Sequence, residues 1–466
     1  MAWALLVAGG AAQAQPAATK LGGDWTRFGY DAARSNSGPA ATGITAANVG
    51  SLVRQRVRLD APVDSSPIYL RGVRVHGHVR DVFFVTSAYG RTVALNAANG
   101  RLLWVFTPSG YRPLAGTYRI TQATPVADPN RRFVYAASPD GRIHKLSVAN
   151  GREASGWPVK ITRLASREKI GPALNYSRGL VLAATGGYIG DAPPYQGHVV
   201  AIAARTGKIV HVWNALCSNR SGLIAPGSCP ESGSAIWGRS GVVVRPGTGS
   251  LLVATGDGRF DGKRYWGDSV LELSPNAGRL LQNWTPTDQR ELETGDVDLG
   301  STAPALLGSG LAVQGGKDGK LRLLSLRRLN GKGGAGTTTG GELQTVEVGA
   351  LFSAPAVWRH AGQTWLFVST FSDTTALRLE GGRLKSAWRI GAGARSPVVA
   401  GGLFYLYTDN GLAVLEPETG RLVARLDADD GHWNSPIVTD GRIALPQGDA
   451  NEHSQTGIVD IWRVRG

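Results

Sequence analysis

Apolar residues in this chain occur in short runs separated by glycine-rich or charged turns. Runs such as VFFVTSA, FVYAASP, LVLAATG and LFYLYTD are rich in β-branched, aromatic and small apolar side chains. Such runs are typical of buried strands. No long stretch repeats apolar residues every three to four positions, as an amphipathic helix would. The pattern therefore predicts an all-β protein made of many short strands.

A strand start recurs along the chain, in which a small residue precedes proline and a β-branched or small apolar residue follows it. It occurs once with glycine in place of proline, at Ser240-Gly241-Val242. The proline examples are Pro67, Pro125, Pro172, Pro304, Pro355, Pro397 and Pro436. Together these starts indicate eight repeats.

A tight turn ending in glycine forms the second recurring element, and the strand after it ends in a large side chain. Glycine supplies the positive φ that such a turn needs. A large flat side chain repeated at one position suits packing between neighbouring sheets. Six residues after the turn glycines stand Phe106, Trp157, Trp213, Trp284, Trp388 and Leu426.

Each repeat holds four strands, which is the unit of a propeller blade. The sequence therefore predicts an eight-bladed β-propeller of four-stranded antiparallel blades, with about 42 residues per blade. The last repeat ends at its third strand. Residues 52–60 are predicted to supply the fourth and to leave no open sheet edge. The predicted divisions are a signal peptide at 1–14, an N-terminal segment at 15–51 and the propeller at 52–466.

The long insertions fall into two classes of connection, those between second and third strands and those between blades. In a propeller these two classes share one face, so that face is the predicted active or binding surface. Neutral growth of loops on one face is the alternative. The candidate residues there are Tyr118, Arg119, Gln122, Trp237, Arg239, Asp257, Asp268, Asp296, Asp298, Lys317, Arg395, His432, Asn434, Glu452 and His453. Any one of them could instead anchor a loop or fill space.

The first residues, MAWALLVAGGAAQAQ, form a short apolar run that ends in a small-x-small cleavage site. They predict a signal peptide and a periplasmic or secreted protein, although a buried N-terminal strand is an alternative. Cys217 and Cys229 fit an oxidising compartment, where they can close one disulfide. Two free buried thiols would be the other interpretation.

The formal net charge of +15 suggests contact with an anionic partner. Because Lys and Arg are spread over every repeat, a generally solvated basic surface is the alternative. No later segment approaches the length of a membrane span. We expect a monomer that neither spans a membrane nor binds nucleic acid.

The repeat resembles the ALDAxTGxxxW motif of the eight-bladed quinoprotein alcohol dehydrogenase-like superfamily. DWTRFGYDAARSNSGP at 24–39 is similar to the N-terminal signature of that superfamily. GDVDLGSTAPAL at 295–306 and GGKDGKLRLLS at 315–325 are similar to its blade-start and lysine motifs. The resemblance covers nearly the whole chain after the predicted signal peptide and implies the propeller fold. It leaves catalysis open, because the superfamily includes enzymes and non-enzymes.

For an enzyme, the resemblance implies pyrroloquinoline quinone (PQQ) and Ca²⁺ as cofactors and an alcohol or sugar as substrate. Asp298 is the candidate base or Ca²⁺ ligand, with Asp296 as a second candidate ligand. The candidate cofactor-binding residues are Trp237, Lys317, Arg395, Asn434 and His432. No haem is expected, because the chain has neither a CxxCH motif nor a methionine after Met1.

A non-catalytic scaffold is the competing interpretation. The same blades resemble outer-membrane barrel assembly lipoproteins, which use them to bind partner proteins. A third interpretation is recognition of an acidic polymer by the basic surface.

Overall fold

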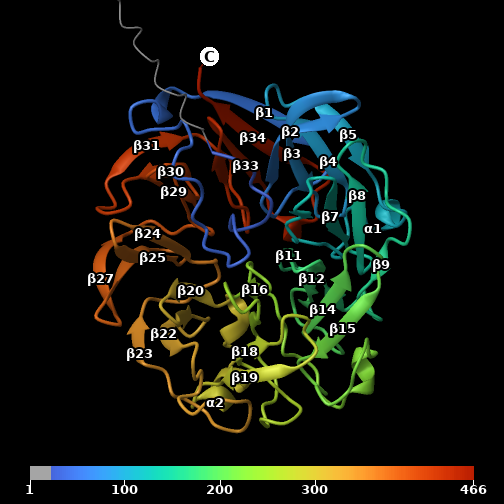
Figure 1. Ribbon diagram of the computed structural model, residues 1–466, viewed down its shortest axis with the longest axis vertical. Coiled ribbons are helices and arrows are strands. Elements are labelled where there is room, and N and C mark those ends of the chain that lie inside the picture. Colours follow the sequence, from blue (N-terminus) through green and yellow to red (C-terminus); the bar gives the residue numbers. More distant parts are fainter. Residues whose placement is uncertain (1–21, 466) are drawn as a thin grey trace, which may run out of the picture.

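The computed structural model describes residues 22–465 of the chain, so the predicted signal peptide lies outside the described residues. Eight four-stranded antiparallel sheets surround a central axis (Figure 1). The predicted eight-bladed β-propeller is therefore confirmed. Each blade begins within three residues of a predicted strand start.

Strands run outward from the axis in sequence order within blades 1 to 7. Blade 1 contains β2 Ile68–Val75, β3 His78–Thr86, β4 Thr92–Asn96 and β5 Leu102–Phe106. Blade 2 contains β6 Val126–Ala127, β7 Phe133–Ser138, β8 Arg142–Ser147 and β9 Val159–Lys160. Blade 3 contains β11 Asn175–Ser177, β12 Leu180–Ala184, β14 His198–Ala203 and β15 Ile209–Asn214. Blade 4 contains β16 Val243–Val244, β17 Leu251–Ala254, β18 Val270–Leu273 and β19 Leu280–Trp284.

The second half of the ring repeats this order until blade 8. Blade 5 contains β20 Ala305–Gly308, β21 Leu311–Gln314, β22 Lys320–Ser325 and β23 Gln344–Glu347. Blade 6 contains β24 Ala356–His360, β25 Gln363–Ser369, β26 Thr374–Glu380 and β27 Arg383–Ile390. Blade 7 contains β28 Val398–Ala400, β29 Leu403–Thr408, β30 Gly411–Leu415 and β31 Leu422–Leu426. Blade 8 contains β32 Ile437–Thr439, β33 Arg442–Gln447, β34 Gly457–Arg463 and β1 Val53–Leu59.

Few other elements are regular. A two-stranded pair, β10 Glu168–Lys169 and β13 Gly186–Gly187, joins two of the long connections. The helices are α1 Tyr111–Leu114 and α2 Gln289–Thr294, with 3₁₀ turns at Val49–Ser51, Pro226–Ser228, Leu299–Ser301 and Ala450–Glu452. None of the helices in residues 22–465 has the length and apolar character needed to cross a membrane.

The middle strands explain why the sequence shows continuous apolar runs. Every residue of β4, β29 and β30 is buried, because each blade packs between two neighbouring blades. The outer strands β5 and β31 have exposed positions, because one face meets solvent. Large side chains of the outer strands pack between blades: the Trp104 indole donates to the carbonyl of Val148 in the next blade at 3.0 Å.

Blade 8 is built from both ends of the ring. β1 pairs antiparallel with β34 along its whole length, from Val53 opposite Arg463 to Leu59 opposite Gly457. Figure 1 shows the blue β1 beside the red β34. The buried Asp460 on β34 forms ion pairs with Arg54 and Arg56 on β1.

The N-terminal segment, residues 22–51, runs into the centre of the ring and bonds to the innermost strands (Figure 1). The fully buried Arg34 donates to the carbonyls of Phe28, Ala173 and Leu174. The Arg239 guanidinium lies 5.9 Å from the Phe28 ring centroid. Backbone bonds join the segment to blades 1, 2, 4, 6, 7 and 8, at Tyr69, Ala127, Val244, Val357, Val399 and Gly441. The segment therefore occupies the middle of the ring, where its Phe28 ring packs against the Arg239 side chain.

The predicted disulfide between Cys217 and Cys229 is present, and both residues are buried. It closes the long connection between blades 3 and 4. Pro226–Ser228, inside this loop, packs near Pro194 of the long loop between β13 and β14. The bridge thus ties down a connection on the elaborated face.

Replacing both cysteines by serine is expected to lower the free energy of unfolding by about 2–4 kcal/mol. The reason is that the bridge restricts the unfolded chain over a sequence separation of 12 residues. Denaturant titration of the oxidised protein and of the double variant measures the difference. Reduced wild-type protein is the control and should match the variant. A loss below about 1 kcal/mol would contradict the prediction.

Candidate functional site

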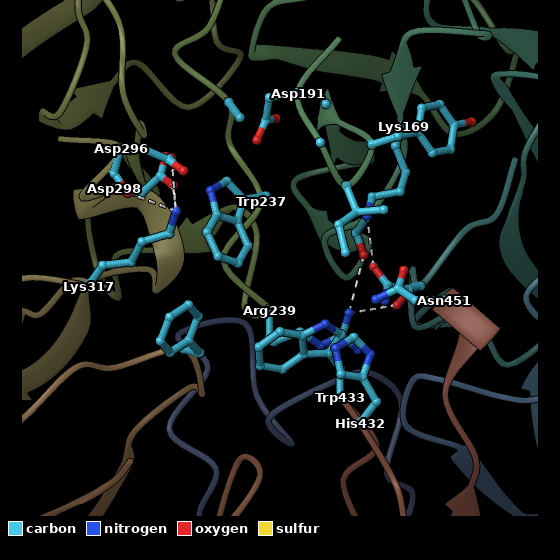
Figure 2. Close-up of a pocket in the computed structure, with 18 of the residues that line it drawn as sticks. Lys169, Asp191, Trp237, Arg239, Asp296, Asp298, Lys317, His432, Trp433 and Asn451 are labelled. Atoms are coloured by element: carbon cyan, nitrogen blue, oxygen red, sulfur yellow. Dashed lines mark hydrogen bonds and ion pairs between the residues drawn. The ribbon is translucent and has the colours of Figure 1, made fainter. Parts of the chain in front are cut away.

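A cavity of about 490 Å³ opens near the centre of the ring. Its walls come from connections between blades and from connections between second and third strands, the two classes that the sequence places on one face. Figure 2 shows side chains from opposite sides of the ring pointing into it. The side chains that line it include Gln122, Lys169, Ile189, Asp191, Trp237, Arg239, Asp257, Asp296, Asp298, Lys317, Phe352, Phe371, His432 and Trp433.

Carboxylates gather at one end of the cavity. Oxygen atoms of Asp257, Asp296 and Asp298 all lie within 4.8 Å of one another. Asp191 lines the same end and raises the pKa of Asp257, so its charge is also close. We call these four residues the acidic end.

The fold holds Asp298 tightly. Its Oδ1 accepts the backbone N–H of Asp257 at 2.9 Å, and its Oδ2 lies 2.5 Å from the Lys317 ammonium. Gly256 is required beside it, because a Cβ there would lie 1.9 Å from Asp298 Oδ1. The buried Asp268 accepts the backbone N–H of Leu299 at 3.1 Å and so anchors the same loop.

Asp296 differs from Asp298 in exposure. Its side chain is 72% exposed, whereas that of Asp298 is 5% exposed. Lys317 donates to Asp296 Oδ1 at 3.0 Å and so bridges the two carboxylates. Asp296 is thus the member of the pair that solutes can reach.

Negative charge at the acidic end is only partly neutralised. Burial and then the neighbouring Asp298 raise the pKa of Asp257 well above its ordinary value. Burial likewise raises the pKa of Asp191. Lys317 is the single cation in contact with this end among the described lining residues. The donor set, four carboxylates around one cavity wall, suits a hard cation with oxygen ligands.

Cations gather across the cavity, where Lys169, Arg239 and His432 form what we call the basic end (Figure 2). Burial lowers the pKa of Lys169 to about 8 and that of Arg239 to about 10. Within residues 22–465 the buried Nε of Arg239 has no hydrogen-bond partner. An anionic ligand could supply one.

His432 is held as a cation by two carboxylates. Its Nδ1 lies 2.8 Å from the fully buried Asp64 and 3.0 Å from Asp449. Burial alone would lower the pKa of His432, but the hydrogen bonds to Asp449 and Asp64 raise it to about 9. The Asp64 carboxylate also accepts hydrogen bonds from the Gln122 side-chain amide and from the Trp433 backbone N–H. Donors of the protein itself therefore already occupy both oxygens of Asp64.

Aromatic rings connect the two ends. The Trp237 indole lies beside the acidic end, with the Lys317 ammonium 5.9 Å from its ring centroid (Figure 2). Phe352 lies 6.3 Å from Trp237 and 6.3 Å from Trp433, measured between ring centroids. A flat ligand could therefore contact rings while its charged groups meet the two ends.

Part of the chain is similar to known proteins in sequence. The family model described as outer membrane protein assembly factor BamB matches residues 47–229. A quinohemoprotein alcohol dehydrogenase of Pseudomonas putida is 26% identical over 196 residues, which are 41% of this chain and 25% of that enzyme.

Solved structures have a similar fold over nearly the whole chain. The structure of quinohemoprotein alcohol dehydrogenase ADHIIG from Pseudomonas putida HK5 superposes with a TM-score of 0.72 at 15% identity, covering 95% of this chain and 80% of that one. A europium-containing methanol dehydrogenase gives 0.71 at 15% identity, covering 95% and 98%. BamB from Moraxella catarrhalis gives 0.54 at 13% identity, covering 88% and 98%.

This chain is an eight-bladed β-propeller, and its residues 47–229 match a family model of PQQ repeats. Five residues proposed from sequence as a cofactor or metal site line one cavity of the propeller: Trp237, Asp296, Asp298, Lys317 and His432. Gln122, Arg239 and Asp257, from the wider candidate set, line it too.

Two residues proposed from sequence to bind a cofactor, Arg395 and Asn434, lie outside this cavity, as do Tyr118, Arg119, Asp268, Glu452 and His453 of the wider set. Arg395 lines a smaller neighbouring pocket of about 80 Å³, where it pairs with Asp409. Asn434 is fully buried and donates to the carbonyl of Val63 at 2.7 Å. Its Oδ1 accepts the backbone N–H of His432 at 2.7 Å, so Asn434 shapes the loop that presents His432.

Sequence reasoning missed Lys169, Asp191, Phe352, Phe371 and Trp433. One signal could have found Lys169: like Arg239 and Arg395, it stands two or three residues before a strand start. Phe352 and Trp433 share this spacing, because each stands three residues before a strand start, at Pro355 and Pro436. Phe371 stands in the connection between β25 and β26 and carries no such signal.

Proposed function

We propose that this propeller is an exported PQQ- and cation-dependent alcohol dehydrogenase. The observation that carries the proposal is the cavity itself, in which four carboxylates face a cluster of cations across a tryptophan ring. The disulfide supports export to an oxidising compartment. The name of the Pseudomonas putida relative, a quinohemoprotein alcohol dehydrogenase found by both sequence and structure, supports the cofactor.

The residues present fit a hard cation. Asp257 and Asp298, whose oxygen atoms lie within 4.8 Å of each other, supply donors, and Asp191 lines the same end of the cavity. A bound ion would relieve the repulsion from Asp298 that adds to burial in raising the pKa of Asp257. Ca²⁺ prefers such ligands. A trivalent lanthanide is the second ion to test, because one structural relative is a europium-containing dehydrogenase.

The residues also fit PQQ, a flat aromatic quinone that carries three carboxylates. Arg239 and Lys169 would hold carboxylates at the basic end, and Trp237 would contact the ring. When bound, the quinone accepts the two electrons of the oxidised alcohol. Asp296, exposed to the cavity beside Asp298, would take the hydroxyl proton.

The test is reconstitution of the purified protein with PQQ and either Ca²⁺ or La³⁺. Quenching of tryptophan fluorescence measures cofactor binding, and dye reduction by a panel of alcohols and sugars measures turnover. Micromolar PQQ binding that requires the cation supports the proposal. Absence of PQQ binding at micromolar concentration with either ion would overturn it.

A non-catalytic scaffold is the competing function, supported by the description of the matching family model. A protein-docking surface has no need for carboxylates held together in a cavity, where burying charge is costly. Stable protein partners that are recovered in a pull-down and lost on trimming the long loops, with no PQQ binding, would favour the scaffold.

Affinity for PQQ is expected to fall as the pH rises from 7 to 10. Lys169 and His432, with pKa values of about 8 and about 9, are cations at pH 7 and lose that charge above those values. Each lost charge-assisted contact should weaken binding of the anion by about 10- to 100-fold. Fluorescence titration at several pH values measures the trend.

The control for this pH prediction is Lys169→Arg, which keeps the charge across the whole range. It should remove the part of the pH dependence near pH 8 and keep the part near pH 9. An affinity that stays constant from pH 7 to 10 in the wild-type protein would contradict the prediction.

A further inference from the structure

Two large apolar side chains at the cavity are left open to solvent. Ile189 is 73% exposed and Phe371 is 72% exposed, the highest values for large hydrophobic side chains in residues 22–465. Both line the cavity, from connections in blades 3 and 6. Exposed apolar groups at a pocket mark a surface that contacts a ligand. Ile189 and Phe371 therefore indicate where the substrate lies, outside the two charged ends.

An aromatic wall leads inward from Phe371. Its ring centroid lies 4.9 Å from that of Phe352, and the Phe352 ring stacks on Trp433 at an interplanar angle of 26°. Phe352 also faces Trp237 at 6.3 Å. The wall therefore runs from an exposed ring to the indole beside the acidic end.

The chemistry of this wall separates two substrate classes. A sugar carries a hydroxyl group on nearly every carbon, and each hydroxyl needs a partner once it leaves water. The faces of Phe352 and Phe371 and the Ile189 side chain offer none. An apolar body, in contrast, gains from every ring it covers.

We propose that the substrate is a primary alcohol with an aromatic or similarly large apolar body, an inference that rests on the proposed function. The body lies against Phe352, Phe371 and Ile189. The carbon that bears the hydroxyl reaches Asp296. There the Asp296 carboxylate would take the hydroxyl proton, and PQQ, when bound, would accept the hydride from the same carbon as the C=O bond of an aldehyde forms.

The first test compares kcat/KM for ethanol, 1-hexanol, benzyl alcohol and glucose in the protein reconstituted with PQQ and the cation. Benzyl alcohol is expected to exceed ethanol by about 10- to 100-fold. The Phe371→Ser and Ile189→Ser variants should each lower the ratio of benzyl alcohol to ethanol by about 10-fold. The proposal would be overturned by equal kcat/KM values for all four substrates or by glucose as the best substrate. It would also be overturned if the ratio of benzyl alcohol to ethanol stayed unchanged in both variants.

Val79→Ser is the matched control, because Val79 is 64% exposed and lies on β3 outside the residues that line the cavity. It should leave the ratio and the activity unchanged. If Val79→Ser lowered the ratio of benzyl alcohol to ethanol as much as Phe371→Ser does, the apolar body of the substrate could not be assigned to the aromatic wall.

The second test is independent of turnover. Saturation-transfer NMR measures binding of benzyl alcohol to the wild-type and Phe371→Ser proteins, with and without PQQ. Binding that Phe371→Ser weakens supports the apolar site even in a protein that binds no PQQ, in which case only the proposed function fails. PQQ binding without binding of benzyl alcohol would overturn the substrate inference and leave the proposed function standing.

Discussion

Turnover of the reconstituted protein with a primary alcohol is expected to fall about 10²–10⁴-fold when Asp298 is replaced by asparagine. Asp298 is buried at the centre of the acidic end, where its two oxygens meet the Asp257 backbone and Lys317. An amide of the same shape keeps the first contact but loses the negative charge that a cation requires. Isothermal titration should therefore show weaker Ca²⁺ binding together with the lost turnover.

Asp296→Asn is the matched variant, because Asp296 shares the Lys317 contact but is exposed to the cavity. We expect a similar loss of turnover with a smaller change in Ca²⁺ affinity. Full turnover in both variants would show that this carboxylate pair is outside the reacting centre. Circular dichroism should show that both variants keep the propeller fold.

The free energy of unfolding is expected to fall by about 3–5 kcal/mol in the Arg34→Ala variant. Arg34 is fully buried and gives hydrogen bonds to three backbone carbonyls, two of them at the start of blade 3. Removing the side chain leaves these carbonyls buried without a donor. Urea titration of the purified variant measures the loss.

Arg131→Ala is the control for Arg34→Ala. Arg131 also ties the N-terminal segment to the ring, through Asp24, but its side chain is 40% exposed. An exposed ion pair of this kind is worth less than about 1 kcal/mol. Equal losses in the two variants would mean that the buried contacts of Arg34 add nothing to stability.

Much of the fold could be predicted because each blade repeats the same physical requirement. The prolines at positions such as Pro67 and Pro397 mark where the chain enters the innermost strand, and strands buried on both faces must be continuously apolar. Turn glycines such as Gly151 could be recognised for a related reason. Gly151 has a φ of +70°, and a Cβ there would lie 2.6 Å from the Trp104 ring.

For the site, the sequence predicts which loops contribute to it but not which side chains of those loops point into the cavity. Asn434 and His432 stand two residues apart in one connection, yet one is a fully buried anchor and the other lines the cavity. Their sequence neighbours do not distinguish these roles, because the direction of each side chain depends on Val63 and Asp64 from far along the chain. For the same reason the contact between the Phe352 and Phe371 rings could not be predicted from sequence.

The pairing of β1 with β34 sets the order in which this protein can mature. During synthesis β1 emerges before the other strands of the ring and its partner emerges last. The equilibrium cost of so long a closure is modest, because it grows only with the logarithm of loop length. Its kinetic cost is larger, since contacts distant in sequence form slowly. Until β34 arrives, β1 has no partner strand, and the face of blade 1 that packs against blade 8 remains open to wrong partners. This is therefore the interval in which a chaperone would matter most.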